Sequence, residues 1–95
     1  MAALMIVNLT FHDLDWAKDY LASVPAMVRA HGGEYFARST AVARIEGDGG
    51  IPDQVVILTF PSLEAIRTFM AHPDYAPFRD ARIAATDSDI LAIEY

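Results

Sequence analysis

The stretch Ala30-His31-Gly32-Gly33-Glu34-Tyr35-Phe36-Ala37-Arg38 decides how this chain folds. Its residues predict the end of a helix, a stop at two glycines, and the start of a strand. Gly32 predicts the left-handed backbone conformation that ends a helix without steric cost. Two polar residues, His31 and Arg38, interrupt an otherwise apolar context, so this stretch bears on both the fold and the possible chemistry.

A helix is expected before these glycines, from Leu14 to about His31, with the Asp13 side chain as its N-cap. Pro25 lies inside this helix and removes one backbone hydrogen bond, so we expect a kink or break near residues 21–24. The apolar side chains at helical spacing form one stripe, which consists of Trp16, Tyr20, Val24, Met27 and Val28. His31 projects near the middle of this stripe, so its ring is expected inside the core or at its rim.

Four segments carry the apolar pattern of strands. They are residues 3–10, 34–45, 54–60 and 90–95. The first is apolar on both alternating faces, which is typical of a strand that is covered on each side. Asn8 interrupts one of its faces and is a candidate pocket residue, although a polar residue near the end of a strand is equally expected. In the second strand, strict alternation places Arg38 on the face of Phe36 and opposite Tyr35.

Two helices are expected between the third and the fourth strand. Ser62 is the predicted N-cap of the first helix, and Pro73 ends it. The apolar stripe of that helix consists of Leu63, Ile66, Phe69 and Met70. Asp74 can start a second, short helix that ends near Ala85 and accommodates Pro77 in its first turn.

The order strand, helix, strand, strand, helix, helix, strand predicts an α+β fold. Apart from the extra short helix, this is the β-α-β-β-α-β order of the ferredoxin-like fold, with a four-stranded antiparallel sheet and helices on one side. Residues 1–95 are expected to form one domain, because a chain of this length leaves no room for a second. The uncovered face of the sheet is apolar, so we expect a second copy of the chain to cover it in a two-fold homodimer.

The composition excludes several classes of protein. Hydrophobic residues make up 54% of the chain, which is enough for a core, and the absence of cysteine excludes disulfides, thiolate catalysis and thiolate metal sites. The net charge of −6 argues against a nucleic-acid partner, because phosphate binding needs clustered Lys and Arg. No charged leader and no apolar segment of membrane-spanning length is seen, so a soluble cytoplasmic protein without a membrane partner is expected.

Several short motifs occur along the chain in a fixed order. They are His31-Gly32-Gly33-Glu34-Tyr35, Arg38, Glu46-Gly47, Phe60-Pro61-Ser62, His72-Pro73-Asp74-Tyr75 and Arg82. In this combination the chain resembles the domain of unknown function 1330 family, within the dimeric α/β barrel superfamily. The resemblance covers essentially the whole chain and implies a homodimer in which two sheets pack together as a barrel with the helices outside. It implies little about the reaction, since relatives in the superfamily include cofactor-independent monooxygenases, isomerases, polyketide cyclases, haem enzymes and non-catalytic proteins.

Side chains of the short helix near residue 80 indicate a small-molecule pocket. Those that project within about 100° of one another by helical spacing are Tyr75, Phe78, Arg79 and Arg82. Two arginines beside aromatic rings could hold a carboxylate or enolate by bidentate hydrogen bonds. The alternative is that Arg79 and Arg82 pair with Asp74, Asp80 or acidic residues of the loops, while their stems cover the core.

His31 and Arg38 are the other candidates for chemistry. His31 could act as a general acid or base near neutral pH. Equally, it could stabilise the helix end through the helix dipole and by donating to a carbonyl. Arg38 either lines the pocket or forms an ion pair across the dimer. No close His-x-x-x-His spacing exists, so no metal site is predicted.

These observations leave two functions open and do not decide whether the protein is an enzyme. An enzyme would carry out cofactor-independent isomerisation, cyclisation or oxygenation of a small anionic or polyketide-like compound. His31 would then be the acid or base, while Arg38 and Arg82, with Arg79, would hold the developing oxyanion. The residues expected to contact the substrate are Asn8, Trp16, Tyr20, Tyr35, Tyr75 and Arg79. The alternative is a non-catalytic ligand-binding or homodimeric assembly module, and no cofactor is expected in either case.

Overall fold

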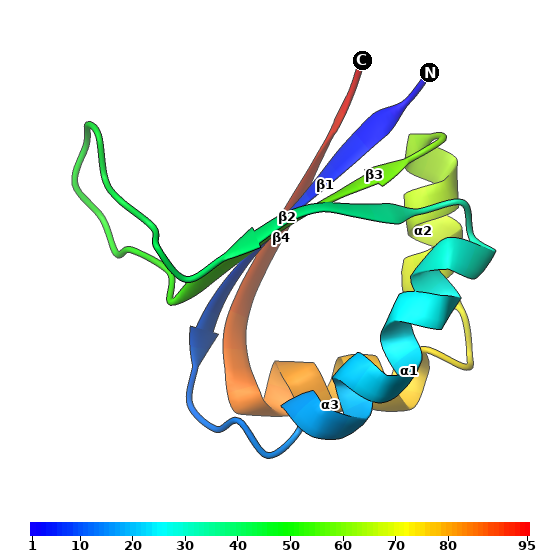
Figure 1. The fold of residues 1–95 in the computed structure, drawn as a ribbon, viewed down its shortest axis with the longest axis horizontal. Coiled ribbons are helices and arrows are strands. Elements are labelled where there is room, and N and C mark those ends of the chain that lie inside the picture. The colour runs from blue at the N-terminus through cyan, green and yellow to red at the C-terminus, as the bar shows by residue number, and fades with distance from the viewer.

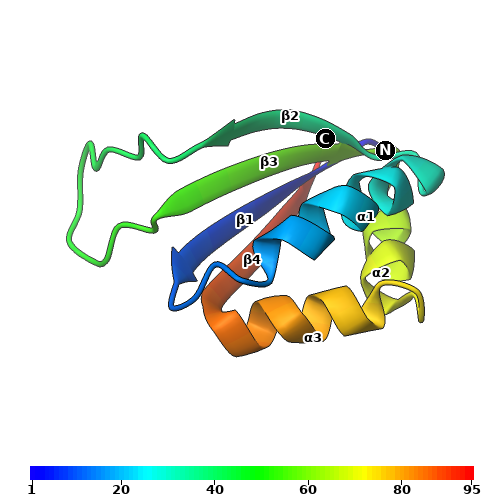
Figure 2. The ribbon, with the colours of Figure 1, turned by 60° about the horizontal axis from the view of Figure 1, so that its bottom comes forward.

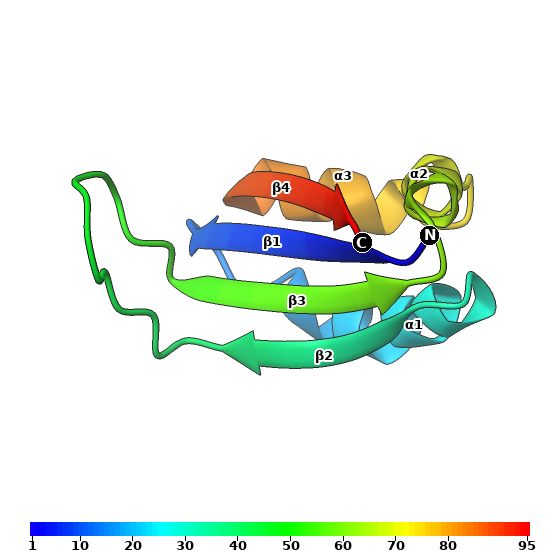
Figure 3. The ribbon, with the colours of Figure 1, turned by 90° about the horizontal axis from the view of Figure 1, so that it is seen from above.

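The computed structural model describes all residues from Met1 to Tyr95 and contains the predicted seven elements in the predicted order (Figure 1). They are β1 (Ala3–Phe11), α1 (Ala17–Ala30), β2 (Glu34–Ser39), β3 (Gln54–Phe60), α2 (Leu63–Ala71), α3 (Ala76–Ala85) and β4 (Thr86–Glu94). The strands form one antiparallel sheet in the order β2-β3-β1-β4 (Figure 3). The three helices cover one face of this sheet and leave the other face open (Figure 2). The ferredoxin-like α+β fold is therefore confirmed.

The core lies between the helices and the covered face of the sheet. Alternate residues of β1 are buried there, and Val24 and Val28 of α1 and Phe69 of α2 pack against them with exposed fractions of 1% each. The intervening β1 residues, including Leu4 and Ile6, face the open side of the sheet and are only half-buried. On the same side, Leu91 and Ile93 of β4 expose 58% and 50% of their surface. None of the helices combines the length and apolar composition that a transmembrane segment needs.

Helix α1 begins three residues later than predicted. The Asp13 carboxylate accepts a hydrogen bond from the backbone N–H of Asp15 at 2.7 Å, so it closes a turn before the helix. Trp16 takes the N-cap position and makes no side-chain capping bond. Of the predicted kink or break near Pro25, the break is absent, since α1 continues through the proline to Ala30 with Val24 and Val28 buried.

The two glycines end α1 as predicted. Gly32 has a φ of +79°, and the N–H of Gly33 donates to the carbonyl of Val28 at 2.9 Å, which satisfies a free carbonyl of the last turn. Gly33 has a second role, because a Cβ at this position would lie only 2.7 Å from the Phe60 ring and 2.8 Å from the Val28 side chain. The helix and β3 can approach each other this closely only with glycine between them.

Strand β2 is shorter than the predicted strand over residues 34–45. The register pairs Ser39 with Val55, next to the start of β3, so residues after Ser39 have no strand to pair with. Residues 40–53 instead form a long loop that extends away from the sheet (Figure 1). A β-bulge lies between Tyr35 and Ala37, as is common in edge strands, and Arg38 pairs with Val56. The bulge places Arg38 on the helix-covered face with Tyr35, so the predicted opposite placement of these two residues is wrong.

The second half of the chain follows its predicted boundaries closely at β3 and α2. Ser62 caps α2, since its hydroxyl accepts from the N–H of Ala65 at 3.0 Å. Helix α3 has Tyr75 rather than Asp74 at its N-cap position, with Pro77 in the first turn. Strand β4 begins at Thr86, four residues before the predicted start, because it pairs with β1 along its whole length up to Phe11.

Candidate functional site

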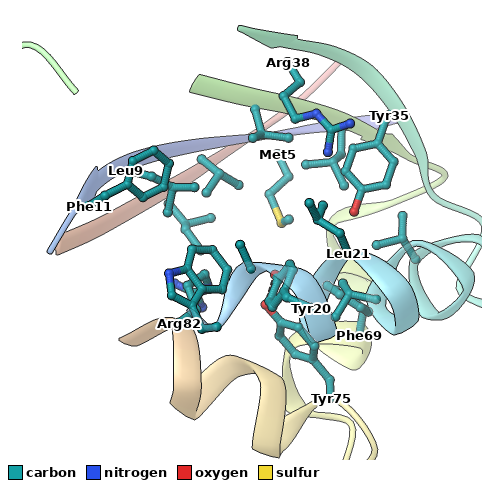
Figure 4. Close-up of a pocket in the computed structure, with 18 of the residues that line it drawn as sticks. Met5, Leu9, Phe11, Tyr20, Leu21, Tyr35, Arg38, Phe69, Tyr75 and Arg82 are labelled. Atoms are coloured by element: carbon teal, nitrogen blue, oxygen red, sulfur yellow. Dashed lines mark hydrogen bonds between the residues drawn. The ribbon is translucent and has the colours of Figure 1, made fainter. Parts of the chain in front are cut away.

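A cavity of about 100 Å³ lies between the covered face of the sheet and helices α1 and α3 (Figure 4). It has 19 lining residues, of which 17 are hydrophobic, and Arg38 and Arg82 are the two that carry charge. Leu14, Leu21 and Arg38 are exposed and lie at its mouth. A closed cavity of about 150 Å³ can hold one benzene ring, so this cavity encloses about one ring at most, and a larger compound would extend through its mouth.

Arg82 is the most unusual residue of this cavity. It lies in the last turn of α3, is only 3% exposed, and takes part in none of the ion pairs of the chain. Its Nε atom is buried without any hydrogen-bond partner. A buried charge without a partner is costly, and a buried guanidinium normally has a carboxylate beside it. The structure therefore offers an uncompensated positive charge at the wall of an apolar cavity.

Arg79 lies one turn earlier on the same helix and shows the opposite behaviour. Its guanidinium donates to the carbonyl of Met70 at 2.9 Å, and its Nε lies 3.5 Å from the Asp80 carboxylate. Arg79 does not line the cavity. From the sequence, Arg79 and Arg82 were expected to act together at the pocket. In the structure Arg79 contacts Met70 of α2 and the neighbouring Asp80, and Arg82 alone lines the cavity.

Two tyrosine hydroxyls meet in the wall beside Arg82. The Tyr20 and Tyr75 oxygens lie 2.7 Å apart, so one hydroxyl donates to the other and one O–H remains free to donate elsewhere. Burial raises the pKa of Tyr20 far above its ordinary value, and the neighbouring Tyr75 hydroxyl raises it further, while the Arg82 charge acts in the opposite direction. Tyr20 is therefore a neutral phenol at physiological pH, able to donate a hydrogen bond and unable to serve as a base.

Tyr35 and Arg38 approach the cavity from the sheet side (Figure 4). The Arg38 guanidinium lies 5.8 Å from the centre of the Tyr35 ring, a cation–π distance that holds the charge at the mouth. Burial raises the pKa of Tyr35, although the Arg38 charge lowers it in part. This second tyrosine also remains a neutral donor near neutral pH.

Trp16 contributes an apolar wall to the same cavity. Its indole N–H donates to the Asp13 carbonyl at 2.7 Å, and its ring meets Tyr20 edge to face at 5.1 Å between centroids. The indole donor is thus used within the turn before α1. The polar side-chain groups left for a ligand are the guanidinium and tyrosine donors, and no carboxylate or histidine lines the cavity. A site built of donors in an apolar wall suits a ligand with anionic or carbonyl oxygen.

Three of the predicted site residues lie elsewhere. Besides Arg79, His31 lines a separate cavity of about 130 Å³ with His72, on the far side of Phe69 and Tyr75. Its Nδ1 lies 2.8 Å from the Met27 carbonyl, the geometry expected of a structural role at the helix end. Asn8 is on the open face of the sheet, in a shallow depression beside Thr10 and Asp87. The structure thus brings together six of the predicted residues, which are Trp16, Tyr20, Tyr35, Arg38, Tyr75 and Arg82.

Sequence reasoning missed the apolar residues of the cavity mouth. Leu21 lines the cavity although 51% of its surface is exposed, and Phe11 lines it at the end of β1. The signal for Leu21 was its helical spacing from Ala17, Val24 and Val28, which extends the stripe around the helix. No cluster of three His, Asp or Glu side chains that could hold a metal ion is formed.

Comparison with family models gives a match over residues 2–95 to the family described as Domain of unknown function (DUF1330). The chain belongs to this family. A comparison with curated proteins gives no match. The DUF1330 fold of this chain is shared by solved structures of low sequence identity, which establish the fold alone.

Three of these structures illustrate the range. A protein of unknown function from Rhodopseudomonas palustris has a TM-score of 0.83 at 17% identity, with 99% of this chain and 82% of that chain covered. SnoaB, a cofactor-independent oxygenase from Streptomyces nogalater, has a TM-score of 0.70 at 17% identity, with 99% and 92% covered. A dimeric ferredoxin-like protein of unknown function from Jannaschia sp. CCS1 has a TM-score of 0.73 at 13% identity, with both chains covered completely.

Proposed function

We propose that this protein binds a small, flat and mainly apolar compound through an oxyanion, such as a carboxylate, phenolate or enolate, inside the cavity beside Arg82. The observation that carries the proposal is the buried Arg82 guanidinium, which has no carboxylate partner and a buried Nε without a hydrogen bond. A bound oxyanion would supply the missing partner, and the low local dielectric would strengthen the attraction. The free hydroxyl of the Tyr20–Tyr75 pair would add a second donor to the same oxygen.

The reaction that such a site supports is a cofactor-independent conversion of the bound anion. Isomerisation, cyclisation and oxygenation of polyketide-like compounds pass through an enolate or phenolate. Water at the cavity mouth would take the proton, because no cavity side chain can, and donors aimed at the oxygen would stabilise the anion that remains. Arg82 would hold this oxygen between the apolar walls. The fold likeness to SnoaB, a cofactor-independent oxygenase, supports this class of reaction without naming a substrate.

The proposal predicts that the protein lowers the pKa of a bound phenol. We suggest titrating 4-nitrophenol, whose phenolate absorbs visible light, with and without excess protein. Wild-type protein should shift the ionisation of the bound probe to lower pH, and Arg82→Gln should abolish this shift. Arg67→Gln removes the same charge from an exposed position on α2 outside the cavity and should behave as wild type. Preferential binding of the neutral phenol would contradict the proposal.

A non-catalytic binding module is the second candidate. It is favoured by the absence of a carboxylate or imidazole among the cavity residues, because the raised pKa values of Tyr20 and Tyr35 leave no side chain there to remove a proton. Exchange of the acidic C–H protons of 2-tetralone in D₂O, followed by NMR, separates the two. An enzyme of the proposed class accelerates exchange in an Arg82-dependent way, whereas a binding module binds the ketone without acceleration.

We further propose that the open face of the sheet is covered by a second copy of the chain. Exposed Leu91 and Ile93 lie on this face beside half-buried Leu4 and Ile6, and a contiguous apolar surface of this kind favours association. The Jannaschia protein of the same fold is dimeric. Sedimentation at micromolar concentration should give a dimer, and Ile93→Asp should give a monomer. Ile83→Asp, which places the same charge on the exposed surface of α3, should remain dimeric.

A further inference from the structure

The cavity carries positive charge on two different walls. Arg82 enters from α3 and is buried, whereas Arg38 enters from β2 at the exposed mouth (Figure 4). Met5 and Leu21 line the space that separates them. A ligand that reaches both guanidiniums must therefore cross an apolar middle section.

The position of Arg38 depends on the one irregularity in the sheet. Regular alternation after Tyr35 would turn Arg38 to the open face, and the bulge between Tyr35 and Ala37 returns it to the face of the cavity. Arg38 takes part in none of the ion pairs of the chain, although acidic residues outnumber basic ones by 13 to 7. Its contact is the Tyr35 ring, which leaves the hydrogen-bonding edge of the guanidinium free.

The two arginines differ in how strongly each would hold an anion. Arg82 is withdrawn from water, so an oxyanion beside it forms a strong, charge-assisted bond. Arg38 is exposed, so water screens its attraction and the contribution to affinity is smaller. The buried residue would supply affinity, and the residue at the mouth would select among compounds that already fit.

We propose that the ligand of this cavity is a flat aromatic or polyketide-like compound with two acidic groups, one held by buried Arg82 and the other, at the opposite end, by Arg38. This inference rests on the proposed function, because it takes the Arg82 anion site as given and adds the second end. Tyr20 and Tyr35 of the cavity, being neutral donors, fit acceptor groups and carry no charge that would repel such a compound.

The experiment compares two probes, naphthalene-2-carboxylate and naphthalene-2,6-dicarboxylate, by isothermal titration calorimetry at fixed salt. Either of the two equivalent carboxylates of the dicarboxylate can face Arg82, so this probe has a twofold statistical advantage without any contact to Arg38. Wild-type protein should exceed that factor and bind the dicarboxylate about four- to tenfold more tightly. Arg38→Gln should reduce the preference to about twofold and leave the affinity of the monocarboxylate nearly unchanged. Arg82→Gln and Arg82→Met should each weaken both probes about tenfold or more. Arg67→Gln controls for the loss of one positive charge, and thermal unfolding confirms that every variant is folded.

The outcomes separate the two proposals. A wild-type preference of only twofold, or a larger preference that survives Arg38→Gln, overturns the two-ended ligand and leaves the Arg82 anion site standing. Affinities that do not change in folded Arg82 variants overturn the anion site, and the two-ended ligand with it. A larger preference that falls to twofold in Arg38→Gln and is retained in Arg67→Gln supports both.

Discussion

Two cavities lie on opposite sides of a wall made by Phe69 and Tyr75, and their polar side chains differ in whether they have a partner within the chain. The first cavity is mainly apolar and contains the buried Arg82, whose Nε has no hydrogen-bond partner. The second contains His31 and His72, whose rings lie 5.3 Å apart. His31 is bonded to the Met27 carbonyl, and the His72 Nδ1 accepts from the N–H of Asp74 at 3.1 Å.

The difference teaches which polar groups are available to a ligand. A carbonyl can only accept, so the Nδ1 of His31 carries its proton and holds the end of α1. A backbone N–H can only donate, so the Nδ1 of His72 is used within its own turn. Both imidazoles therefore have a partner inside the chain, whereas the Arg82 guanidinium has none and is the group that gains most from a bound anion.

The largest effect is expected from removing the Phe69 ring, which forms part of the wall between the two cavities. Phe69→Ala deletes a ring that is 1% exposed and lies 4.5 Å from the Tyr75 ring, so we expect the free energy of unfolding to fall by about 3–5 kcal/mol. Urea unfolding followed by circular dichroism measures this. Met70→Ala, next to it on α2 and only half-buried, should cost clearly less. A similar loss in both variants would mean that the Phe69 ring contributes no more packing energy than the half-buried Met70 side chain.

The second test acts on the unpartnered charge. Arg82→Met keeps a long apolar side chain and removes a buried cation, so the ligand-free protein should gain about 1–2 kcal/mol of stability. In a chain of this length that corresponds to a rise in Tm of roughly 4–16 °C. Differential scanning calorimetry measures it, with Arg79→Met as the matched control. The control should destabilise, because Arg79 is bonded to Met70 and Asp80. A loss of stability in Arg82→Met would show that the guanidinium is satisfied.

Much of the fold could be predicted because its signals are local. The two glycines after α1, the Ser62 cap and the apolar run of β3 each act within a few residues of themselves, and all three predictions hold. The errors arise where pairing with a segment distant in the sequence determines where a strand begins or ends. Strand β2 ends where β3 offers no partner, and β4 begins early because β1 is long enough to pair with it.

The candidate site was predicted less completely, for the same physical reason. A bulge in the edge strand β2 turns Arg38 to the cavity, and no residue pattern in β2 predicts this bulge. Arg79 and Arg82 are three residues apart on one helix, and only the position of α2 separates their roles. The helical stripe did predict Trp16 and Tyr20 at the cavity.

The hydroxyl pair in the wall gives a smaller, pH-dependent effect. Because the pKa of Tyr20 is raised in the folded protein, its contribution is fully present below the ordinary tyrosine pKa of about 10 and is lost as the pH rises above it. Each tyrosine whose pKa is raised on folding makes the free energy of unfolding fall by up to about 1.4 kcal/mol per pH unit above pH 10. Tyr20→Phe should reduce the slope of unfolding free energy between pH 10 and 11, at a cost of about 1 kcal/mol at neutral pH for the lost bond to Tyr75. Tyr95→Phe, on an exposed residue, is the control, and an unchanged slope in Tyr20→Phe would contradict the assignment.

The smallest expected effect concerns His31, for which the sequence predicted two alternative roles. His31→Gln removes the ring that lies 5.6 Å from Phe69, so stability should fall by about 0.5–1.5 kcal/mol, measured by thermal unfolding. Affinity for naphthalene-2-carboxylate should stay the same, because the Phe69–Tyr75 wall stands between His31 and Arg82. His72→Gln, in the same second cavity, should likewise leave affinity unchanged. If His31→Gln instead weakened binding as much as Arg82→Gln while leaving Tm unchanged, the two cavities would act as one site and His31 would belong to it.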